Sequence, residues 1–279
     1  MFARKPKQSH DEKWRDVLMG EARGHMCWSP WMRRISRAIP SDPRCKLCDG
    51  PFGPPGSTVM GLLGFGPSRI NRRICRHCIQ ALEKNPGGAE VELSFLFADV
   101  RGSTALAEQT SAEQFSQLMA RFYGTAASVV DARNGIVDKF VGDQVVALFI
   151  PGFAGADHAS DAIAAARELL AKTGHGEGTP WIPVGAGVHS GVAYVGTIGE
   201  GDALDFTALG DSVNTAARLA SCAAAGEILV SGAAAAASQL DTAGLEARTL
   251  ALRGRAESVE AWVTAVGEPL GQESLAPVS

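Results

Sequence analysis

The order of strand-like and helix-like segments between residues 90 and 266 constrains the fold more than any other feature of the sequence. The run EVELSFLFADV, residues 90–100, is apolar and rich in strand-forming residues. A segment at about 111–132 follows, and its apolar residues recur at helical spacing. Ser111 and Gln114 form a capping-box pattern at its start, which predicts a helix N-terminus there.

The segments that follow complete a β-α-β-β-α-β order. GIVDKFV and QVVALFI indicate two strands joined by a tight turn at Gly142-Asp143. An Ala-rich helix is expected at about 156–173, then the strand runs PVGAGVHSGVAYVGTI and ALDFTAL, a helix at about 212–223 and two late strands. This order predicts an α+β fold with a ferredoxin-like core and extra strands.

Charge divides the chain into two parts. Residues 1–88 carry 16 Lys and Arg against 7 Asp and Glu, whereas the remainder carries 10 against 23. Such asymmetry indicates two units with different tasks. We predict a helical segment at 1–44, a four-cysteine, zinc-ribbon-like module at 45–88, a large domain at 89–268 and a disordered tail at 269–279.

The sequence favours a cytoplasmic protein. No stretch approaches the roughly 18–20 uninterrupted apolar residues that a membrane span needs. The N-terminal residues are basic but are not followed by the apolar core of a signal peptide.

Three polar segments of the large domain are candidates for one site. In FADVRGST, Asp99 ends a buried strand and precedes a glycine-containing turn, where backbone N–H groups suit a phosphate and the carboxylate suits a hard cation. In KFVGD, the turn presents Asp143, and Lys139 lies roughly 13 Å away along the strand at ~3.3 Å per residue. Each pattern alone is also compatible with an ordinary capped loop or a surface turn.

The third segment is TALGDSVNTAAR. Asn214 and Arg218 lie four residues apart at the start of a helix and so share one face. An arginine there could hold a phosphate oxygen with its fork of donors. A helix cap with a surface arginine is the simpler alternative, but it leaves the polar stripe on an Ala-rich helix unexplained.

Together, in this order and spacing, these segments resemble the catalytic domain of the class III adenylyl and guanylyl cyclases, over residues 90–268. The resemblance implies that Asp99 and Asp143 bind two Mg²⁺ or Mn²⁺ ions per active site, with the Val100 carbonyl as a further ligand. It also implies a homodimer in which the aspartates come from one subunit and the other site residues from its partner.

The remaining roles also follow from the resemblance. Lys139 and Thr207 are similar to the base-selecting pair, Asn214 to the residue that orients the ribose, and Arg218 to the group that stabilises charge on the α-phosphate. Many relatives have aspartate where Thr207 stands, and the threonine type resembles a soluble, bicarbonate-responsive branch. Guanylyl cyclases of the family typically carry a glutamate and a cysteine at the base-selecting positions. A lysine donor matches the acceptor N1 of adenine, so conversion of ATP to 3′,5′-cyclic AMP and pyrophosphate is expected.

Four cysteines form the pattern C-x₂-C-x₂₆-C-x₂-C, which matches the sulfur tetrahedron of a structural zinc site. These are Cys45, Cys48, Cys75 and Cys78. An iron–sulfur cluster is the alternative, since four thiolates also satisfy it. We expect a regulatory module with an unidentified ligand or partner, and favour this over a nucleic-acid-binding or membrane-surface role for the basic residues. The competing function is a nucleic-acid- or partner-binding zinc protein whose cyclase-like domain is catalytically weak and serves to dimerise.

Overall fold

A computed structural model of the chain describes the polypeptide in segments. The described residues are 9–21, 38–41, 44, 45, 48, 50, 51, 53, 54, 56–62, 66–68, 74–200, 205–251 and 258–266. The predicted tail at 269–279 and most of the predicted helical segment at 1–44 lie outside these residues. No helix in the described segments is long and apolar enough to cross a membrane.

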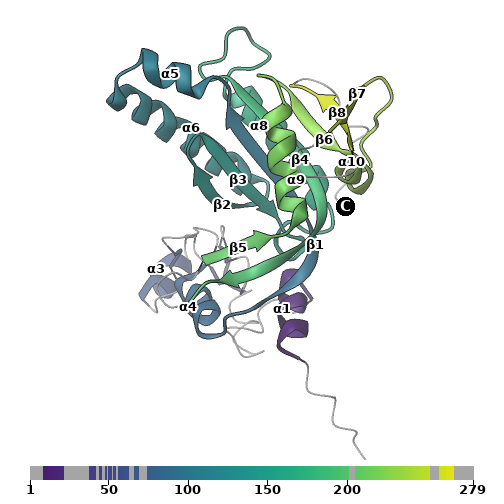
Figure 1. Ribbon diagram of the computed structural model, residues 1–279. Coiled ribbons are helices and arrows are strands. Elements are labelled where there is room, and N and C mark those ends of the chain that lie inside the picture. The colour runs from purple at the N-terminus through teal and green to yellow at the C-terminus, as the bar shows by residue number, and fades with distance from the viewer. Residues whose placement is uncertain are drawn as a thin grey trace, which may run out of the picture. The chain divides into compact units, whose positions relative to one another are not determined.

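The chain forms two compact units, which are described separately. Unit 1 comprises residues 1–91, 150–155 and 193–209, and unit 2 comprises residues 92–149, 156–192 and 210–279. Figure 1 labels their helices and strands.

From β1 to β4 the chain follows the expected β-α-β-β-α-β order, which confirms the α+β prediction. The strands are β1 (Gly88–Val100), β2 (Ile136–Val141), β3 (Gln144–Phe149), β4 (Val184–Ile198), β5 (Asp205–Leu209), β6 (Ile228–Ser231), β7 (Glu246–Leu250) and β8 (Val259–Thr264). Unit 2 contains the helices α5 (Ser103–Gln109), α6 (Ala112–Ala132), α8 (His158–Lys172), α9 (Asp211–Cys222) and α10 (Gly232–Ser238). Among the described residues of unit 1, the helices are α1 (His10–Leu18), α3 (Gly56–Leu62), α4 (Arg76–Lys84) and α7 (Pro151–Ala154).

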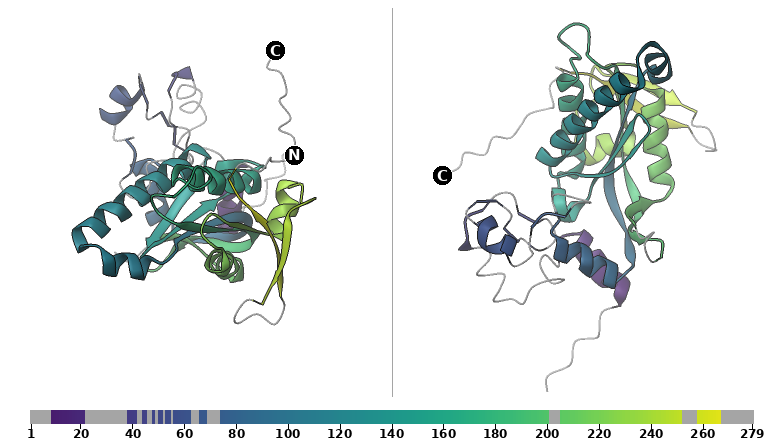
Figure 2. Two further views of the ribbon diagram at one scale, coloured as in Figure 1. Left: turned by 90° about the horizontal axis from the view of Figure 1, so that it is seen from above. Right: turned by 90° about the vertical axis from the view of Figure 1, so that its left-hand side faces the viewer.

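The strands lie in the order β2-β3-β1-β4-β6-β8-β7, and β5 pairs with the end of β4. β1 and β3 are antiparallel, whereas β4 and β6 are parallel. In unit 2, α6 and α8 pack together on one face of the sheet and α9 lies on the opposite face (Figure 2).

Helices on both faces explain why β1 is apolar without alternation. The four consecutive residues Phe95–Ala98 are all buried, because neither face of the strand meets solvent. Phe122 of α6, Phe149 of β3 and Leu169 of α8 are fully buried in the same core. The capping box at the start of α6 is present as predicted: Gln114 N donates to Ser111 Oγ at 3.2 Å, and Ser111 N donates to Gln114 Oε1 at 3.1 Å.

In unit 1, α1 is an amphipathic helix with a capping box of its own, formed by Ser9 and Glu12. Its buried residues are Trp14, Val17 and Leu18. The Trp14 ring stacks on Phe206 of β5, with ring centroids 6.5 Å apart and planes inclined by 20°. The helix therefore packs directly on the β4–β5 hairpin.

Candidate active site and metal centre

Backbone pairing brings the two candidate aspartates together. Asp99 at the end of β1 lies opposite Gln144, the first residue of β3, and the neighbouring N–H of Val100 donates to the carbonyl of Asp143 at 3.3 Å. Gly142 and Asp143 form the turn between β2 and β3, as predicted, and Gly142 has a φ of 60° that favours glycine. Two carboxylates thus come close together where β1 ends and β3 begins.

Asp99 is a half-buried carboxylate with one positively and one negatively charged neighbour, Arg101 and Asp143. Burial raises the pKa of Asp99, the Arg101 guanidinium opposes that rise, and the Asp143 carboxylate adds to it. Two neighbouring carboxylates are also a favourable oxygen donor set for a divalent cation. The residues present therefore fit a hard metal ion.

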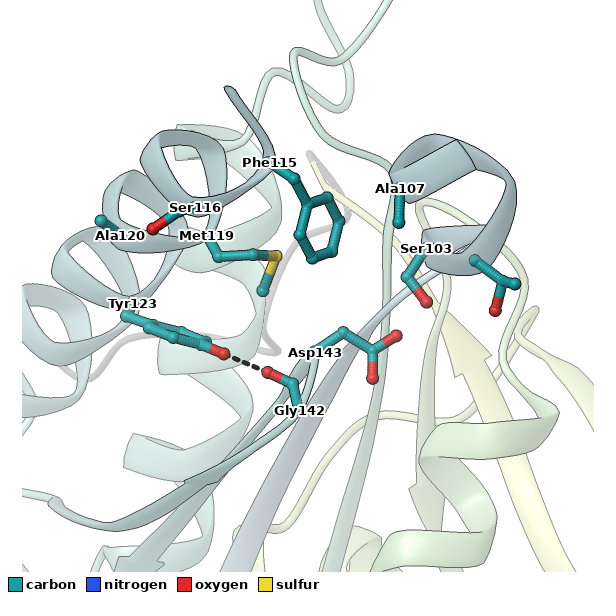
Figure 3. Close-up of a pocket in the computed structure, with 10 residues that line it drawn as sticks. Ser103, Ala107, Phe115, Ser116, Met119, Ala120, Tyr123, Gly142 and Asp143 are labelled. Carbon is teal, nitrogen blue, oxygen red and sulfur yellow. Dashed lines mark hydrogen bonds between the residues drawn. The ribbon is translucent and has the colours of Figure 1, made fainter. Parts of the chain in front are cut away.

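A hollow of about 670 Å³ opens beside Asp143. Figure 3 shows Ser103 of α5 and Asp143 facing it from one side, with Phe115 and Met119 of α6 across from them. The Tyr123 hydroxyl donates a hydrogen bond to the Gly142 carbonyl. Helix α6 therefore supports the turn that carries Asp143.

The two candidates for base selection lie in different units. Lys139, in unit 2, is paired with the Asp138 carboxylate at 3.5 Å and keeps 40% of its side chain exposed. The register between β2 and β3 shifts between Val137 and Lys139, which places Lys139 opposite Val146. Thr207, in unit 1, is buried on β5 opposite Gly196 of β4.

Helix α9 carries both Asn214 and Arg218, in its first and second turns. Asn214 is exposed and Arg218 is half-buried. Within the part of the chain that the structure describes, Nη1 of Arg218 is a buried donor without a hydrogen-bond partner. Buried donors are nearly always paired in folded proteins, so this nitrogen is suited to an anionic ligand.

Arg101 is a residue of this region to which the sequence pattern assigned no role. Its Nη2 donates to Asp99 Oδ2 at 2.7 Å and to the Ala220 carbonyl at 3.0 Å, and its Nη1 donates to the Ser221 carbonyl at 3.1 Å. A basic residue two positions after a site aspartate was the available signal, but its long-range partners are visible only in the fold.

The four cysteines of the N-terminal module converge in unit 1. Their sulfur atoms all lie within 4.8 Å of one another, and all four residues are buried. Two pairs of sulfurs, Cys45–Cys78 and Cys48–Cys75, are each 3.7 Å apart. Such a cluster can bind a metal ion.

Backbone N–H groups near the cysteines donate hydrogen bonds to their sulfur atoms, which favours thiolates. Cys45 N donates to the Gly50 carbonyl at 2.8 Å. Cys75 N donates to Cys45 Sγ at 3.2 Å, and Cys78 N, in the first turn of α4, donates to Cys75 Sγ at 3.3 Å. Hydrogen bonds from the other cysteines lower the pKa of Cys45.

The cysteine of helix α9, Cys222, is exposed, although a cysteine in a helix of this domain is most simply a core residue. It is the last residue of α9 and lies outside the stripe formed by Thr215, Ala216, Leu219 and Ala220. It takes no part in the cysteine cluster.

Residues 89–264, well over half of the chain, match the adenylate and guanylate cyclase catalytic domain family. The fold, with its paired aspartates and the arginine-bearing helix α9, is thus that of a cyclase catalytic domain, and the chain belongs to this family.

Individual relatives include both kinds of cyclase. An adenylate cyclase of Anabaena cylindrica is 29% identical over 163 residues, which is 56% of this chain and 32% of that protein. The chain therefore matches only about a third of the length of this curated relative. The guanylyl cyclase Cya2 has a TM-score of 0.59 at 28% identity and covers 66% of this chain and 98% of its own. The adenylyl cyclase CyaB from P. aeruginosa has a TM-score of 0.55 at 28% identity and covers 65% and 97%.

Proposed function

We propose that the protein is an adenylate cyclase that converts ATP to 3′,5′-cyclic AMP and pyrophosphate at the interface of a homodimer. The observation that carries this proposal is the closeness of Asp99 and Asp143, at the end of β1 and the start of β3, within a domain of the cyclase family. The buried, unpartnered Nη1 of Arg218 supports it, because a phosphate would satisfy that donor.

Asp99, Asp143 and the Val100 carbonyl would hold two Mg²⁺ or Mn²⁺ ions. When bound, such ions lower the pKa of the ribose 3′-hydroxyl and neutralise charge on the pyrophosphate leaving group. The chain's own contribution is to fix the carboxylates: β1 and β3 set their spacing, and α6 holds the turn through Tyr123.

The choice of ATP over GTP rests on Lys139 and Thr207. A lysine ammonium donates hydrogen bonds only, so it matches the acceptor N1 of adenine and opposes the N1–H of guanine. Thr207 would accept from the adenine 6-amino group. The relatives include both guanylyl and adenylyl cyclases, so the preference is argued from these two residues alone.

Arg218 and Asn214 would act on the sugar and the α-phosphate. The arginine fork would stabilise the charge that develops on the phosphate oxygens, and Asn214 would orient the ribose for in-line attack. In the proposed homodimer these two residues come from the partner of the subunit that provides the aspartates, so a two-fold dimer contains two equal sites.

Zinc is the metal we propose for the cysteine cluster. A tetrahedron with Zn–S bonds of about 2.3 Å has sulfur–sulfur edges of about 3.8 Å, close to the two 3.7 Å separations. In a multi-iron cluster the thiolates bind different irons, so four sulfurs all within 4.8 Å do not suit it.

We also propose that this module regulates the cyclase. Helix α4 begins at the cysteine cluster and leads through Asn85–Gly87 into β1. Gly87 N donates to Thr197 Oγ1 at 2.7 Å, and Thr197 N donates to the Gly87 carbonyl at 2.8 Å, so this linker is fastened to the β4–β5 hairpin that bears Thr207.

Turnover by the purified protein tests the proposal. With Mn²⁺ and either ATP or GTP, we expect cyclic AMP and pyrophosphate, with ATP as the preferred substrate. Asp99→Asn or Asp143→Asn should abolish the product while the dimer persists in size-exclusion chromatography. Retained turnover in either variant would contradict the metal assignment. Absence of turnover in the wild type together with salt-sensitive DNA binding would favour the nucleic-acid-binding alternative instead.

A further inference from the structure

Arg101 joins two segments that are far apart in the sequence. Its guanidinium reaches the Asp99 carboxylate at 2.7 Å and the carbonyls of Ala220 and Ser221 at 3.0 and 3.1 Å. All of these residues belong to unit 2. One side chain therefore bridges the end of β1 and the end of α9.

The last carbonyls of a helix have no partner within the helix, and the dipole makes that end negative. A planar guanidinium can satisfy several such oxygens at once, which a lysine ammonium cannot do with the same geometry. Arg101 is thus bound by two helix carbonyls and one carboxylate, and this fixes its position as well as theirs.

The neighbouring strand makes room for this arrangement. A Cβ on Gly185 of β4 would lie 2.8 Å from the carbonyl oxygens of Ala223 and Ala224 and 3.1 Å from Nε of Arg101. Only glycine at this position lets the end of α9 and the guanidinium approach the strand so closely.

A short series of contacts continues from Arg101 to Arg218. Ser221, whose carbonyl accepts from Arg101, donates through its hydroxyl to the Arg218 carbonyl at 2.7 Å. Asn214 lies one turn before Arg218 on the same helix. The position of α9 along its axis is therefore tied to Asp99 through Arg101.

We propose that Arg101 is a positioning residue that couples the metal-binding aspartate to helix α9. The inference rests on the proposed function, in which Asp99 and Arg218 of one subunit serve the two different active sites of the dimer. Arg101 then links the sites: a displacement of Asp99 in one is passed to Arg218 in the other.

Homodimers of variants give the first test. Arg101→Gln should lower kcat roughly 10- to 100-fold, the range expected when a site group is misplaced by about 1 Å. The KM for ATP should change far less, because the lost interaction supports the transition state. The matched control is Arg248→Gln, which removes an arginine paired with Glu227 and Glu246 elsewhere in unit 2. A kcat for Arg101→Gln equal to that of the control would overturn the proposal.

Mixed dimers give the second test. Combining an Asp99→Ala chain with an Arg218→Ala chain leaves one intact site, with Asp99 from the second chain and Arg218 from the first. Two further mixed dimers then carry Arg101→Gln, one on the chain that supplies Asp99 and the other on the chain that supplies Arg218. We expect the rate to fall about tenfold or more in both arrangements, since the bridge positions both ends. Loss only on the chain that supplies Asp99 would overturn the coupling.

Arg101→Lys separates the two ends of the bridge. A lysine can still pair with Asp99 but cannot hold two helix carbonyls as a fork. It should therefore preserve activity on the chain that supplies Asp99 and reduce it on the chain that supplies Arg218; equal activity in both arrangements would overturn the coupling.

If the mixed dimer without any change at Arg101 yields no product, the shared-site part of the proposed function fails, and the homodimer comparison with Arg248→Gln decides the role of Arg101.

Discussion

The Tyr123 hydroxyl donates a hydrogen bond to the backbone carbonyl of Gly142, the residue before Asp143. The same ring stacks on Phe140 of β2, with ring centroids 4.4 Å apart. Helix α6 therefore contacts both the turn itself, at Gly142, and the strand that leads into it, at Phe140. Neither Tyr123 nor Phe140 is expected to touch the nucleotide.

Tyr123→Phe keeps the stacked ring and removes the hydrogen bond. We expect kcat to fall about fivefold, as the loss of about 1 kcal/mol from one hydrogen bond implies. Initial rates at saturating ATP and Mn²⁺ measure this effect. Thr125→Val is the control, because the Thr125 hydroxyl donates to the Arg121 carbonyl within α6, away from the turn. Equal rates for wild type and Tyr123→Phe would show that the turn is rigid without this contact.

Lys139→Glu replaces a donor with an acceptor at the proposed base-selecting position. The ratio of kcat/KM for ATP to that for GTP should fall about tenfold or more, since a hydrogen bond to a charged group contributes about 1.5–3 kcal/mol. Separate progress curves with each nucleotide give the ratio. Lys172→Gln, which alters a surface lysine paired with Glu168, should leave it unchanged. An unchanged ratio in Lys139→Glu would remove Lys139 from base selection.

Cys45→Ser removes one thiolate from the buried cluster. We expect it to lose the bound metal and to lower the apparent melting temperature, because metal binding and folding are coupled in such sites. Elemental analysis should find one zinc per wild-type chain, and the protein should be colourless. Cys222→Ser, which lies outside the cluster and is exposed, should retain the full metal content. Iron with visible absorption in the wild type would contradict the zinc assignment.

Trp14→Ala removes the ring that stacks on Phe206, next to Thr207. The KM for ATP should rise severalfold with a smaller change in kcat, because Thr207 would contact the base equally in the ground and transition states. Steady-state kinetics on the full chain separate the two constants. Trp14→Phe keeps an aromatic partner and should behave like the wild type. A rise in KM for both variants, or for neither, would argue that the stack does not position Thr207.

Two histidines predict how stability depends on pH. Burial lowers the pKa of His175, and burial likewise lowers the pKa of His158 despite the opposing charges of Glu92 and Asp157. His175 accepts from the Val184 N–H through Nε2 at 3.0 Å, which requires that nitrogen to be unprotonated. Below about pH 6.5 the unfolded chain therefore binds more protons than the folded one.

Stability should accordingly be complete above about pH 6.5 and fall as the pH drops below it, by up to about 1.4 kcal/mol per pH unit for each histidine that stays neutral. Glu168 and Glu227 have pKa values lowered by Lys172 and Arg248, so their contributions are lost only at more acidic pH. Denaturant unfolding between pH 8 and pH 5 measures the slope. His158→Asn should flatten it, and a slope of zero in the wild type between pH 6.5 and pH 5 would contradict the assignment.

The central part of the fold follows from local sequence signals. The unbroken apolar run around Phe95, the capping box at Ser111 and the Gly142-Asp143 turn each determine their elements through short-range chemistry, so their positions could be predicted. Helix α10 and strand β7 were not predicted. The stretch EARTL in β7 is polar and half-exposed, and it becomes a strand because it pairs with β8 along its whole length.

Some residues of the candidate site could likewise be predicted from the sequence, and others could not. Asp99 and Asp143 were assigned to one site through the resemblance to the cyclase family, because the sequence alone did not show that β1 pairs with β3 and brings Asp99 next to the Gly142-Asp143 turn. Arg101 could not be given its role, because its partners Ala220 and Ser221 offer only backbone carbonyls, which no side-chain pattern marks. The bulge before Lys139 was also not foreseen, since it depends on how β2 pairs with β3.

The absence of a side chain at Gly185 has a consequence for genetics. A residue that contacts neither substrate nor metal is rarely sought in a screen for inactive alleles, yet even an added methyl group here would press on the end of α9 and on the guanidinium at once. Such alleles should cluster at this codon, and suppressors of them should lie in the last turn of α9 and the residues after it, where a small shift would make room for the added carbon.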